Sequence, residues 1–320
     1  MQETKLGNSQ ITIPQLCVGT WAWGNNWISD NEASMSDLND VFQNAVTKGI
    51  DFFDTAEVYG NGNSEKILGE LMRRNSKKVR VASKFNPRLD RQTDHPMEEA
   101  LKGSLKRLNL DAISLYYIHV VEMESNIEKW VNQLGDVYKE GLVDAVGVSN
   151  YHYNNFLRAY ELLDKRGIHL SAVQVHYSLI NREHEFSGLL DECKKLGVAF
   201  FGYMPLAQGL LTGKYSKDKL PRGMIREQLY CEKTFDDIER LLATLKSIGN
   251  KYGKAPAQIA LNWVMSKGIV PIVGARDKEQ IIANIESTDL SLSAEEIEVL
   301  DEMTKSNTRD VINVPWDANQ

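Results

Sequence analysis

Short apolar runs alternate with longer stretches of helical periodicity along almost the whole chain. In residues 34–48, for example, Leu38, Val41 and Phe42 fall on one face of a helix, and Gly49 follows as a helix-ending residue. The same pattern predicts helices at residues 34–48, 64–72, 97–108, 127–140, 153–166, 185–196, 235–252, 257–267, 280–286 and 294–303. Apolar runs of strand length lie between them, at residues 16–19, 50–54, 79–84, 114–119, 145–149, 172–176, 198–203 and 269–273.

Eight strands that each precede a helix predict an α/β fold, a closed (β/α)8 TIM barrel with extra C-terminal helices. Residues 5–14 add two β-prone pieces around a Gly-Asn-Ser turn, which predicts an N-terminal β-hairpin that plugs one end of the barrel. No linker divides the sequence, so residues 1–320 are expected to form a single domain. The alternative is a doubly wound open sheet, but the Gly-x-Gly-x-x-Gly motif with which such a sheet binds a dinucleotide is absent from the sequence.

Composition and charge narrow the class of protein. Hydrophobic residues make up 42% of the chain and charged residues 25%, as in ordinary soluble proteins. The net charge of −7, without a dense Lys/Arg block, argues against nucleic-acid binding. Cys17, Cys193 and Cys231 lack the spacing of a zinc site or a disulfide framework. Neither a signal peptide nor the ~18 apolar residues of a membrane span are found, so we expect a cytoplasmic protein, and a monomer because no apolar helix is evidently exposed.

Polar residues stand at the carboxyl ends of several predicted strands. In a barrel these ends converge on one mouth, where catalytic residues gather. The candidates are Asp54, Lys84, His119, Ser149, Gln174 and Tyr203, with Tyr59 in the loop after the second strand.

Four of these candidates form a coherent chemical set. A tyrosine has an ordinary pKa of ~10, and a neighbouring cation such as Lys84 would lower it. Asp54 would hold the lysine charged and in place, and His119 would hydrogen-bond the reacting oxygen or pass a proton. Together they suggest a proton donor aimed at a carbonyl oxygen. Taken singly, the four residues are compatible with a structural ion pair, a core histidine and a packing tyrosine.

Other residues of the predicted mouth admit simpler interpretations. Glu57 is interpreted as a solvated loop acid. Glu122 and Glu124 lack the histidines or further carboxylates of a metal site, so no metal is expected. Three tryptophans, Trp21, Trp23 and Trp27, crowd one loop and could line a pocket or pack in the core. The residues predicted to line the substrate pocket are Trp21, Trp23, Tyr59, Phe85, His119 and Val120, with the tail residue Trp316 as a further candidate.

Three motifs together make the sequence resemble the aldo-keto reductase superfamily. They are Asp-Thr-Ala-Glu-Val-Tyr-Gly at 54–60, Gly-Val-Ser-Asn at 147–150 and Pro-Leu-Ala-Gln-Gly-Leu-Leu-Thr-Gly-Lys at 205–214, and the likeness runs from residue 16 to about residue 304. The resemblance implies that Asp54, Tyr59, Lys84 and His119 are the catalytic tetrad, with Tyr59 as the general acid.

The resemblance also implies an NADP(H) cofactor that lies extended across the barrel mouth. Ser149, Asn150 and Gln174 would hold the nicotinamide carboxamide, and Tyr203 would stack on the ring. The remaining implied cofactor contacts are Thr20, Trp21 and Asp54 near the first strands, Pro205, Leu206, Gln208, Gly209 and Lys214 in a strap over the pyrophosphate, and Gly274, Arg276, Gln280 and Asn284 at the adenosine end.

The sequence departs from the family pattern in three places. Met204 replaces a serine that is common near the pyrophosphate. Val-Val-Glu at 120–122 replaces Trp-Pro-Asp or Arg-Pro-Asp, so the pocket wall is altered. Gly274-Ala275 replaces the Lys-Ser pair that many members use for the 2′-phosphate, which leaves Arg276 as the expected phosphate partner and NADPH as the expected cofactor.

The predicted function is therefore the reversible, NADPH-dependent reduction of an aldehyde or ketone. The alternatives are a cofactor-sensing regulatory subunit with weak residual reductase activity, and an acid/base barrel without a redox cofactor. The identity of the substrate does not follow from the residues.

Overall fold

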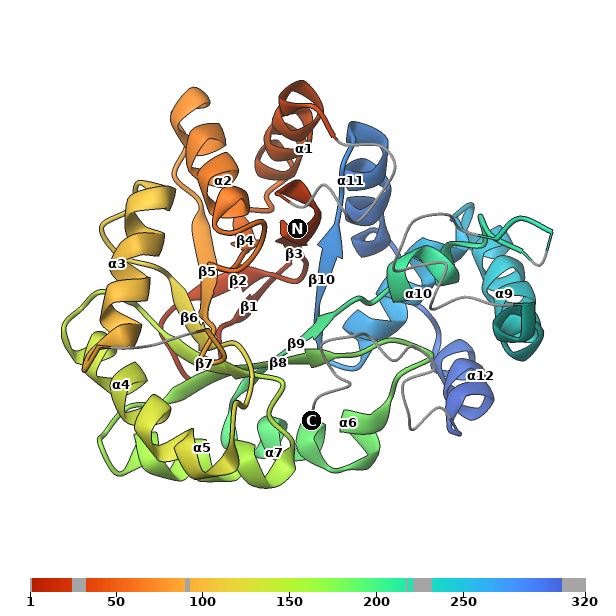
Figure 1. Ribbon diagram of the computed structural model, residues 1–320. Helices are drawn as coiled ribbons and strands as arrows, with labels where there is room; N and C mark the ends of the chain where they lie inside the picture. The colour runs from red at the N-terminus through yellow and green to blue at the C-terminus, as the bar shows by residue number, and fades with distance from the viewer. Residues whose placement is uncertain (1, 25–32, 90–92, 217, 221–231, 307–320) are drawn as a thin grey trace.

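The computed structural model describes residues 2–24, 33–89, 93–216, 218–220 and 232–306. In this part of the chain eight parallel strands close into a barrel, in which the last strand pairs with the first (Figure 1). The predicted (β/α)8 fold is confirmed, and each barrel strand lies within two residues of its expected bounds. The strands are β3 (Cys17–Gly19), β4 (Phe52–Asp54), β5 (Arg80–Phe85), β6 (Leu115–Ile118), β7 (Val146–Ser149), β8 (Leu170–His176), β9 (Ala199–Tyr203) and β10 (Val270–Gly274).

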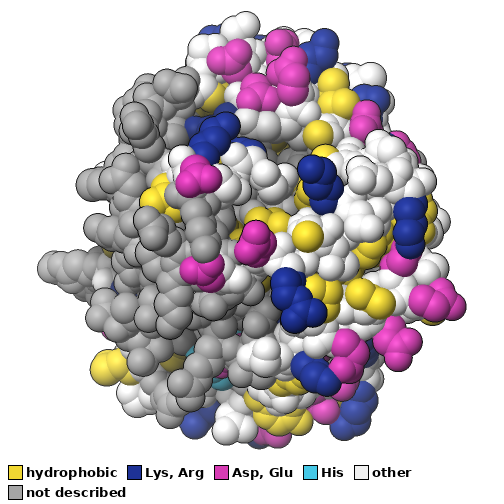
Figure 2. Space-filling model, turned by 90° about the vertical axis from the view of Figure 1, so that its right-hand side faces the viewer, with side chains coloured by type: hydrophobic (Ala, Val, Ile, Leu, Met, Phe, Trp, Pro, Cys, Tyr) yellow, Lys and Arg dark blue, Asp and Glu magenta, His cyan; other side chains and the backbone are white. Residues whose placement is uncertain are grey.

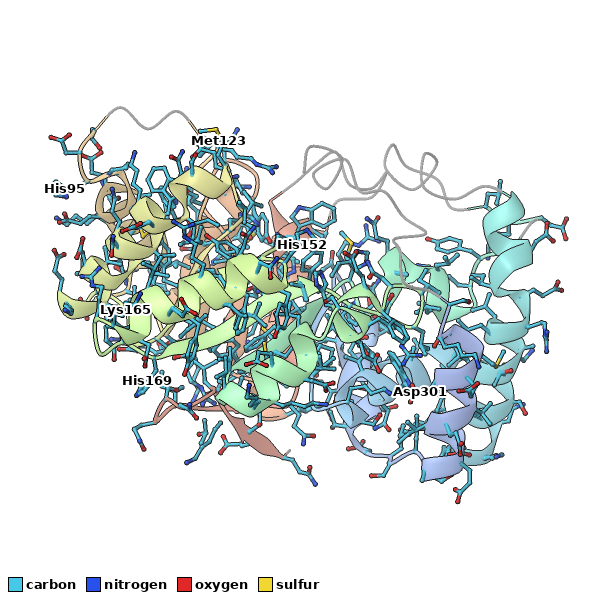
Figure 3. The ribbon with its side chains drawn as sticks, turned by 90° about the horizontal axis from the view of Figure 1, so that it is seen from below. His95, Met123, His152, Lys165, His169 and Asp301 are labelled. Atoms are coloured by element: carbon cyan, nitrogen blue, oxygen red, sulfur yellow. The ribbon has the colours of Figure 1, made fainter. Side chains whose placement is uncertain are left out.

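An antiparallel hairpin of β1 (Glu3–Lys5) and β2 (Thr12–Pro14) precedes the barrel. Leu6 and Ile13 are fully buried in the apolar cluster that fills the barrel interior, so the hairpin plugs the barrel as predicted. Figure 3 places His169, just before β8, and Met123, after β6, toward opposite edges of the molecule. The loops that follow the strands therefore lie at the end away from the hairpin.

Helices surround the barrel on the outside (Figure 1). The helix α1 begins as the sequence predicts, since Ser34 and Asp37 form a reciprocal capping box. The α-helices are α1 (Met35–Thr47), α2 (Asn63–Arg74), α3 (Pro96–Leu108), α4 (Ile127–Lys139), α5 (Tyr153–Asp164), α6 (Glu183–Phe186), α7 (Leu189–Leu196), α9 (Glu232–Tyr252), α10 (Pro256–Ser266), α11 (Lys278–Ile285) and α12 (Ala294–Thr304). Short 3-10 turns are η1 (Trp21–Trp23), η2 (Glu124–Asn126), η3 (Ala207–Thr212) and η4 (Glu286–Thr288).

The single helix expected at residues 185–196 is wrong. The chain forms the short α6 and then α7, and Gly188 between them has a φ of +83°. This left-handed conformation interrupts the α-helix and favours glycine over residues with a side chain. The helix expected at 235–252 also begins three residues earlier, at Glu232.

Side chains alternate between the two faces of the barrel wall, as they do along any strand. Phe53 stacks outward on Phe42 of α1, with 5.3 Å between ring centroids, whereas Phe52 stacks inward on Phe201 of β9 at 5.9 Å. Asp54 lies two residues beyond Phe52 and therefore faces the interior at the mouth. Lys84 stands in the same relation to Ala82, another member of the interior cluster.

A network of ion pairs fastens the loop after β8 to the C-terminal helices. Arg182 pairs with Glu185 of α6 at 2.8 Å and with Asp301 of α12 at 3.4 Å. Lys267, which follows α10, pairs with Asp301 at 2.5 Å and with Glu185 at 3.5 Å. Burial opposes ionisation of Glu185, but hydrogen bonds from Arg182 and Tyr177 outweigh it and lower the pKa of this carboxyl to about 2. The network is therefore charged at neutral pH.

None of the helices in the described ranges is long and apolar enough to cross a membrane. On the face of the molecule in Figure 2, acidic and basic side chains are interspersed. This face therefore lacks, among its described residues, the basic stripe of a nucleic-acid surface.

Candidate active site

Lys84 is fully buried at the end of β5, and its ammonium group has three oxygen partners. It donates hydrogen bonds to Asp54 Oδ1 at 2.5 Å, to the carbonyl oxygen of Thr55 at 2.8 Å and to Tyr59 Oη at 3.3 Å. An ammonium group has three donors, so all of them are used and the cation is fixed. The structure thus brings the predicted Asp54, Lys84 and Tyr59 together.

The charge of Lys84 is sustained by its partners. Burial lowers the pKa of Lys84, but the Asp54 carboxylate and the Tyr59 phenol outweigh burial, and the resulting pKa lies above the ordinary value. Lys84 is therefore a cation throughout the neutral range.

The Lys84 cation lowers the pKa of Tyr59 as expected, but the net shift of this pKa is upward. Burial raises the pKa of the phenol, the Lys84 cation opposes that rise, and the Asp54 carboxylate adds to it, so the pKa ends above its ordinary value. Desolvation outweighs the cation because the phenolate would lose water in the barrel mouth. Tyr59 consequently carries its proton at neutral pH.

His119 lies edge-on to Tyr59, with 5.8 Å between ring centroids. Burial, and then the positive charges of Lys84 and Arg88, lower the pKa of His119 well below its ordinary value. Its Nδ1 atom has no hydrogen-bond partner in the described part of the chain. A neutral imidazole beside the Tyr59 phenol can hydrogen-bond a ligand oxygen, and the other option, transfer of a proton from an imidazolium, is disfavoured.

Gln174, on β8, completes the surroundings of Asp54. Its side-chain amide donates to Asp54 Oδ2 at 2.8 Å, while Lys84 occupies Oδ1. Both carboxylate oxygens are therefore bonded. Gln174 was predicted to touch the cofactor, and in this structure its NH2 group orients the aspartate.

Ser149, Asn150 and Tyr203 form a connected row across β7 and β9. Asn150, which has a φ of +57°, donates to Ser149 Oγ at 3.2 Å and to the carbonyl oxygen of His119 at 3.0 Å. Tyr203 donates its hydroxyl to Asn150 Oδ1 at 2.8 Å. The ring of Tyr203 stacks on His176, with 5.3 Å between centroids and 13° between planes. One face of Tyr203 is thus backed by His176, a residue that the sequence analysis did not select.

After β9 the chain folds into a tight loop with several left-handed residues. Met204, Ala207 and Gln208 have φ values of 53°, 47° and 53°, and Gln208 donates to the Met204 sulfur at 3.8 Å. A Cβ added to Gly209 would lie 3.8 Å from Lys214 Nζ, which places that cation against the loop. Pro205 is buried and Leu206 packs on the core.

The loop after β10 is held by two of its predicted cofactor contacts. Gln280 accepts a hydrogen bond from the Arg276 backbone N–H at 3.1 Å, and Asn284 donates to the Gly274 carbonyl oxygen at 3.2 Å. Gly274 is exposed and the Arg276 side chain is half-buried. Gln280 and Asn284 therefore shape the loop that presents Arg276.

The sequence of the chain matches a known protein family. Residues 15–305 match the sequence model described as the aldo/keto reductase family. The chain belongs to this family. It is 33% identical to the chloroplastic pyridoxal reductase of Arabidopsis thaliana over 97% of the chain and 88% of that protein. It is also 30% identical to a probable voltage-gated potassium channel subunit beta of Oryza sativa subsp. japonica, covering 91% of the chain and 92% of that protein.

A solved aldo/keto reductase supports the same assignment. The enzyme of Klebsiella pneumoniae, in complex with NADP and acetate, shares 26% identity and a TM-score of 0.73, over 95% of this chain and 96% of that one. The chain is therefore an oxidoreductase of the aldo/keto reductase family.

Two residues that were predicted to line the substrate pocket, Phe85 and Trp23, are buried in the apolar core outside the barrel wall. Phe85 is fully buried against Trp130 of α4, with 5.2 Å between rings, because it follows the inward-facing Lys84 and so points outward. Trp23 packs at 6.1 Å from Phe53 in the outer core and donates its indole N–H to the Ala275 carbonyl oxygen at 2.9 Å. Neither residue lines the mouth.

The other expected contacts near the first strands are mixed. Thr20 is fully buried and donates its hydroxyl to the Asp54 carbonyl oxygen at 3.0 Å, so it holds the backbone of Asp54 in place. Trp21 is half-buried, and Val120, next to His119, is 8% exposed. Trp27 and Trp316 lie outside the described residues.

The acids of the mouth have structural partners. Glu57 is half-buried and accepts a hydrogen bond from the Asn86 backbone N–H at 2.7 Å, so its interpretation as a solvated loop acid is wrong. Glu122 accepts from Asn126 and from the Trp130 indole, both at 3.1 Å. The side chain of Glu124 lies outside the described residues. Among the described residues no group of three or more His, Cys, Asp or Glu side chains could hold a metal ion.

Proposed function

We propose that the chain is an NADP(H)-dependent reductase that converts an aldehyde or ketone to the alcohol, reversibly. The observation that carries the proposal is the fixed ammonium of Lys84, which lies 2.5 Å from the Asp54 carboxylate and 3.3 Å from the Tyr59 hydroxyl. A protonated phenol beside a permanent cation is suited to give its proton to an oxygen that becomes negative.

The residues around the mouth fit an extended dinucleotide. Lys214 against the loop after β9 and Arg276 in the loop after β10 supply cations for phosphate groups. Ser149 offers its hydroxyl proton for a carboxamide, Gln174 its second amide N–H, and Asn150 the second lone pair of Oδ1. The ring of Tyr203, which stacks on His176, is the aromatic partner for the flat nicotinamide ring. When bound, the reduced nicotinamide supplies the hydride for the carbonyl carbon.

The side chains of the tetrad then divide the remaining work. His119, neutral and adjacent to Tyr59, hydrogen-bonds the substrate oxygen and orients it. Tyr59 transfers its proton to that oxygen as negative charge develops. Lys84 stabilises the resulting phenolate, and Asp54 keeps Lys84 charged. In alcohol oxidation the same proton returns to Tyr59.

A panel of aldehydes and ketones tests the proposal. Purified protein is mixed with NADPH, and cofactor consumption is followed at 340 nm with each compound. We expect saturable consumption, with one mole of alcohol formed per mole of NADPH. Background consumption with every compound, despite tight NADPH binding, would contradict it.

A second candidate function is a cofactor-sensing regulatory subunit. It is supported by the 30% identity to the probable channel subunit beta of rice. Tight NADPH binding combined with background turnover across the panel would favour this candidate. Failure to bind NADPH at all would contradict both candidates and favour an acid/base barrel without a redox cofactor.

A further inference from the structure

Ser64 lies in the first turn of α2 and contacts both ends of the loop that carries Tyr59. Its backbone N–H donates to the Tyr59 carbonyl oxygen at 3.2 Å, and its hydroxyl lies 3.1 Å from Thr55 Oγ1. The side chains of Ser64 and Thr55 are fully buried. Figure 1 shows α2 on the outside of the barrel between α1 and α3, so Ser64 reaches this loop from the helix layer.

The Ser64 hydroxyl also contacts the loop after β3. It donates to the Thr20 carbonyl oxygen at 2.8 Å and lies 2.7 Å from Thr20 Oγ1. Thr20 in turn donates both its backbone N–H, at 2.9 Å, and its hydroxyl, at 3.0 Å, to the Asp54 carbonyl oxygen. Ser64, Thr20 and Thr55 therefore form one buried hydroxyl cluster around the backbone of residues 54 and 55.

Hydrogen counting explains why a hydroxyl is needed at position 64. Each of the three hydroxyls has a single proton and two lone pairs. With the Ser64 proton on the Thr20 carbonyl oxygen, Ser64 Oγ remains as the acceptor for Thr55 Oγ1. Alanine would supply neither the donor nor the acceptor: the Thr55 hydroxyl would lose the acceptor Ser64 Oγ, and the Thr20 carbonyl oxygen would keep only its hydrogen bond from the Trp23 backbone N–H at 2.9 Å.

The backbone that this cluster holds bears directly on the charged groups of the site. Lys84 donates to the Thr55 carbonyl oxygen at 2.8 Å and to Asp54 Oδ1 at 2.5 Å. A shift of residues 54 and 55 would carry the ammonium with it and change its 3.3 Å separation from Tyr59 Oη.

The neighbouring backbones leave little room for compensation. A Cβ on Gly60, whose φ is +56°, would lie 2.1 Å from the Gly24 carbonyl oxygen, and a Cβ on Gly24 would lie 2.6 Å from the Ser64 nitrogen. Three segments, the loop after β3, the Tyr59 loop and the start of α2, thus meet at backbone contact around Ser64.

We propose that Ser64 is a positioning residue, which sets the separation of Lys84 Nζ and Tyr59 Oη. Its hydroxyl bonds Thr55 at one end of the 55–59 loop, and its backbone N–H bonds Tyr59 at the other end. It is buried beneath the loop and acts only through Thr55, Thr20 and Tyr59. The proposal rests on the proposed reductase function for its kinetic test, and one of the readouts below is independent of turnover.

The test compares Ser64→Ala with a matched buried serine, Ser171→Ala. Ser171 is 3% exposed at the start of β8, and its hydroxyl donates to the His169 carbonyl oxygen at 3.4 Å, at the barrel end away from the mouth. For Ser64→Ala we expect kcat to fall by about 10- to 100-fold, since small misplacements of a reacting group have effects of this size, while the Kd for NADPH changes by less than about twofold. Ser171→Ala should change neither quantity.

The independent readout is the Cζ resonance of Tyr59 in protein labelled with [13Cζ]tyrosine, assigned by its loss in Tyr59→Phe. Ser64→Ala should shift this resonance, because the Lys84 hydrogen bond to the phenol changes, and Ser171→Ala should leave it in place. If Ser64→Ala does not fold, Thr55→Val is used in its place. This variant keeps the side-chain shape and removes only the Thr55 hydroxyl, one of the two hydroxyl neighbours of Ser64 Oγ, and it should produce the same shift.

Unchanged kcat and an unchanged Tyr59 resonance in Ser64→Ala, or in Thr55→Val where that variant replaces it, would overturn the proposal. A wild-type protein without carbonyl reductase activity would contradict the proposed function alone. In that case the Tyr59 resonance by itself decides the positioning role of Ser64.

Discussion

Replacement of Asp54 by asparagine removes the charge that compensates the buried Lys84. The side chains of Lys84 and Asp54 are 0% and 5% exposed, and their charged atoms lie 2.5 Å apart. At an effective dielectric constant near 20, two charges at this distance attract by about 7 kcal/mol, and desolvation of the two ions cancels several kcal/mol of that. Loss of one partner leaves an uncompensated buried ion, so we expect Asp54→Asn to lower the free energy of unfolding by about 3–5 kcal/mol at pH 7.

The assay is urea unfolding of wild type, Asp54→Asn, Lys84→Met and the double variant. Because the double variant contains neither charge, we expect it to recover much of the lost stability while remaining inactive. Glu302→Gln serves as the control, since the Glu302–Lys305 pair lies on the surface with both side chains 63% exposed, and a small effect is expected.

The loss in Asp54→Asn should also depend on pH. In wild type the Lys84 pKa is raised above its unfolded value, so this contribution to stability is lost as pH rises through the folded pKa. Without Asp54, burial lowers the pKa below the unfolded value, the folded state binds fewer protons, and stability increases with pH. The difference in the free energy of unfolding between wild type and Asp54→Asn should therefore narrow between pH 7 and 10. A loss below about 1 kcal/mol at pH 7, or a gap that widens with pH, would refute the reasoning.

Three further predictions concern other parts of the molecule. Arg276→Ala should weaken NADPH binding by about 10-fold or more and leave NADH binding nearly unchanged, because the guanidinium is the expected partner of the 2′-phosphate. Both affinities are measured by fluorescence titration, and equal losses for the two cofactors would contradict this prediction. Since the Glu185 pKa is about 2, its stabilising contribution is complete above the ordinary carboxyl value and is lost as pH falls toward 2. The melting temperature should therefore fall more steeply between pH 5 and 3 in wild type than in Glu185→Gln, and parallel curves would disprove the assignment. Phe85→Leu should lower the free energy of unfolding in urea by about 1–2 kcal/mol without changing the order of preferred carbonyl substrates. Trp21→Ala should change that order. A change of order in Phe85→Leu would show that Phe85 contributes to the substrate pocket.

The barrel could be predicted because the pattern of an apolar run followed by a helical period occurs eight times along the chain. An error of one or two residues in the bounds of a strand does not change the fold that this pattern indicates. The site could be predicted in part, since the polar residues that end β4, β5 and β6 must meet at one mouth in such a barrel. The pairing of Asp54, Lys84 and Tyr59 follows from that convergence and is confirmed at 2.5 and 3.3 Å. The direction of the Tyr59 pKa shift did not follow, because it depends on the depth of burial, which the sequence does not specify.

Other residues depended on facts that the sequence states weakly or not at all. Alternation along β5 was a usable signal, since Lys84 facing the interior requires Phe85 to face the helices. For Trp23 no such rule exists, because its position in the short η1 turn is set by contacts with Phe53 and Ala275, far away in sequence. Ser64 was equally hidden, because a serine in the first turn of a helix is ordinary in sequence terms.

The most direct test of the central claim is a comparison of wild type with Tyr59→Phe. NADPH affinity is measured by fluorescence titration, and the rate of carbonyl reduction by single turnover with the best substrate of the panel. The account predicts a rate lower by about 10²- to 10⁴-fold with an unchanged Kd for NADPH, because phenylalanine preserves the ring and removes only the transferred proton. A rate in Tyr59→Phe equal to that of wild type would contradict the assignment of Tyr59 as the proton donor.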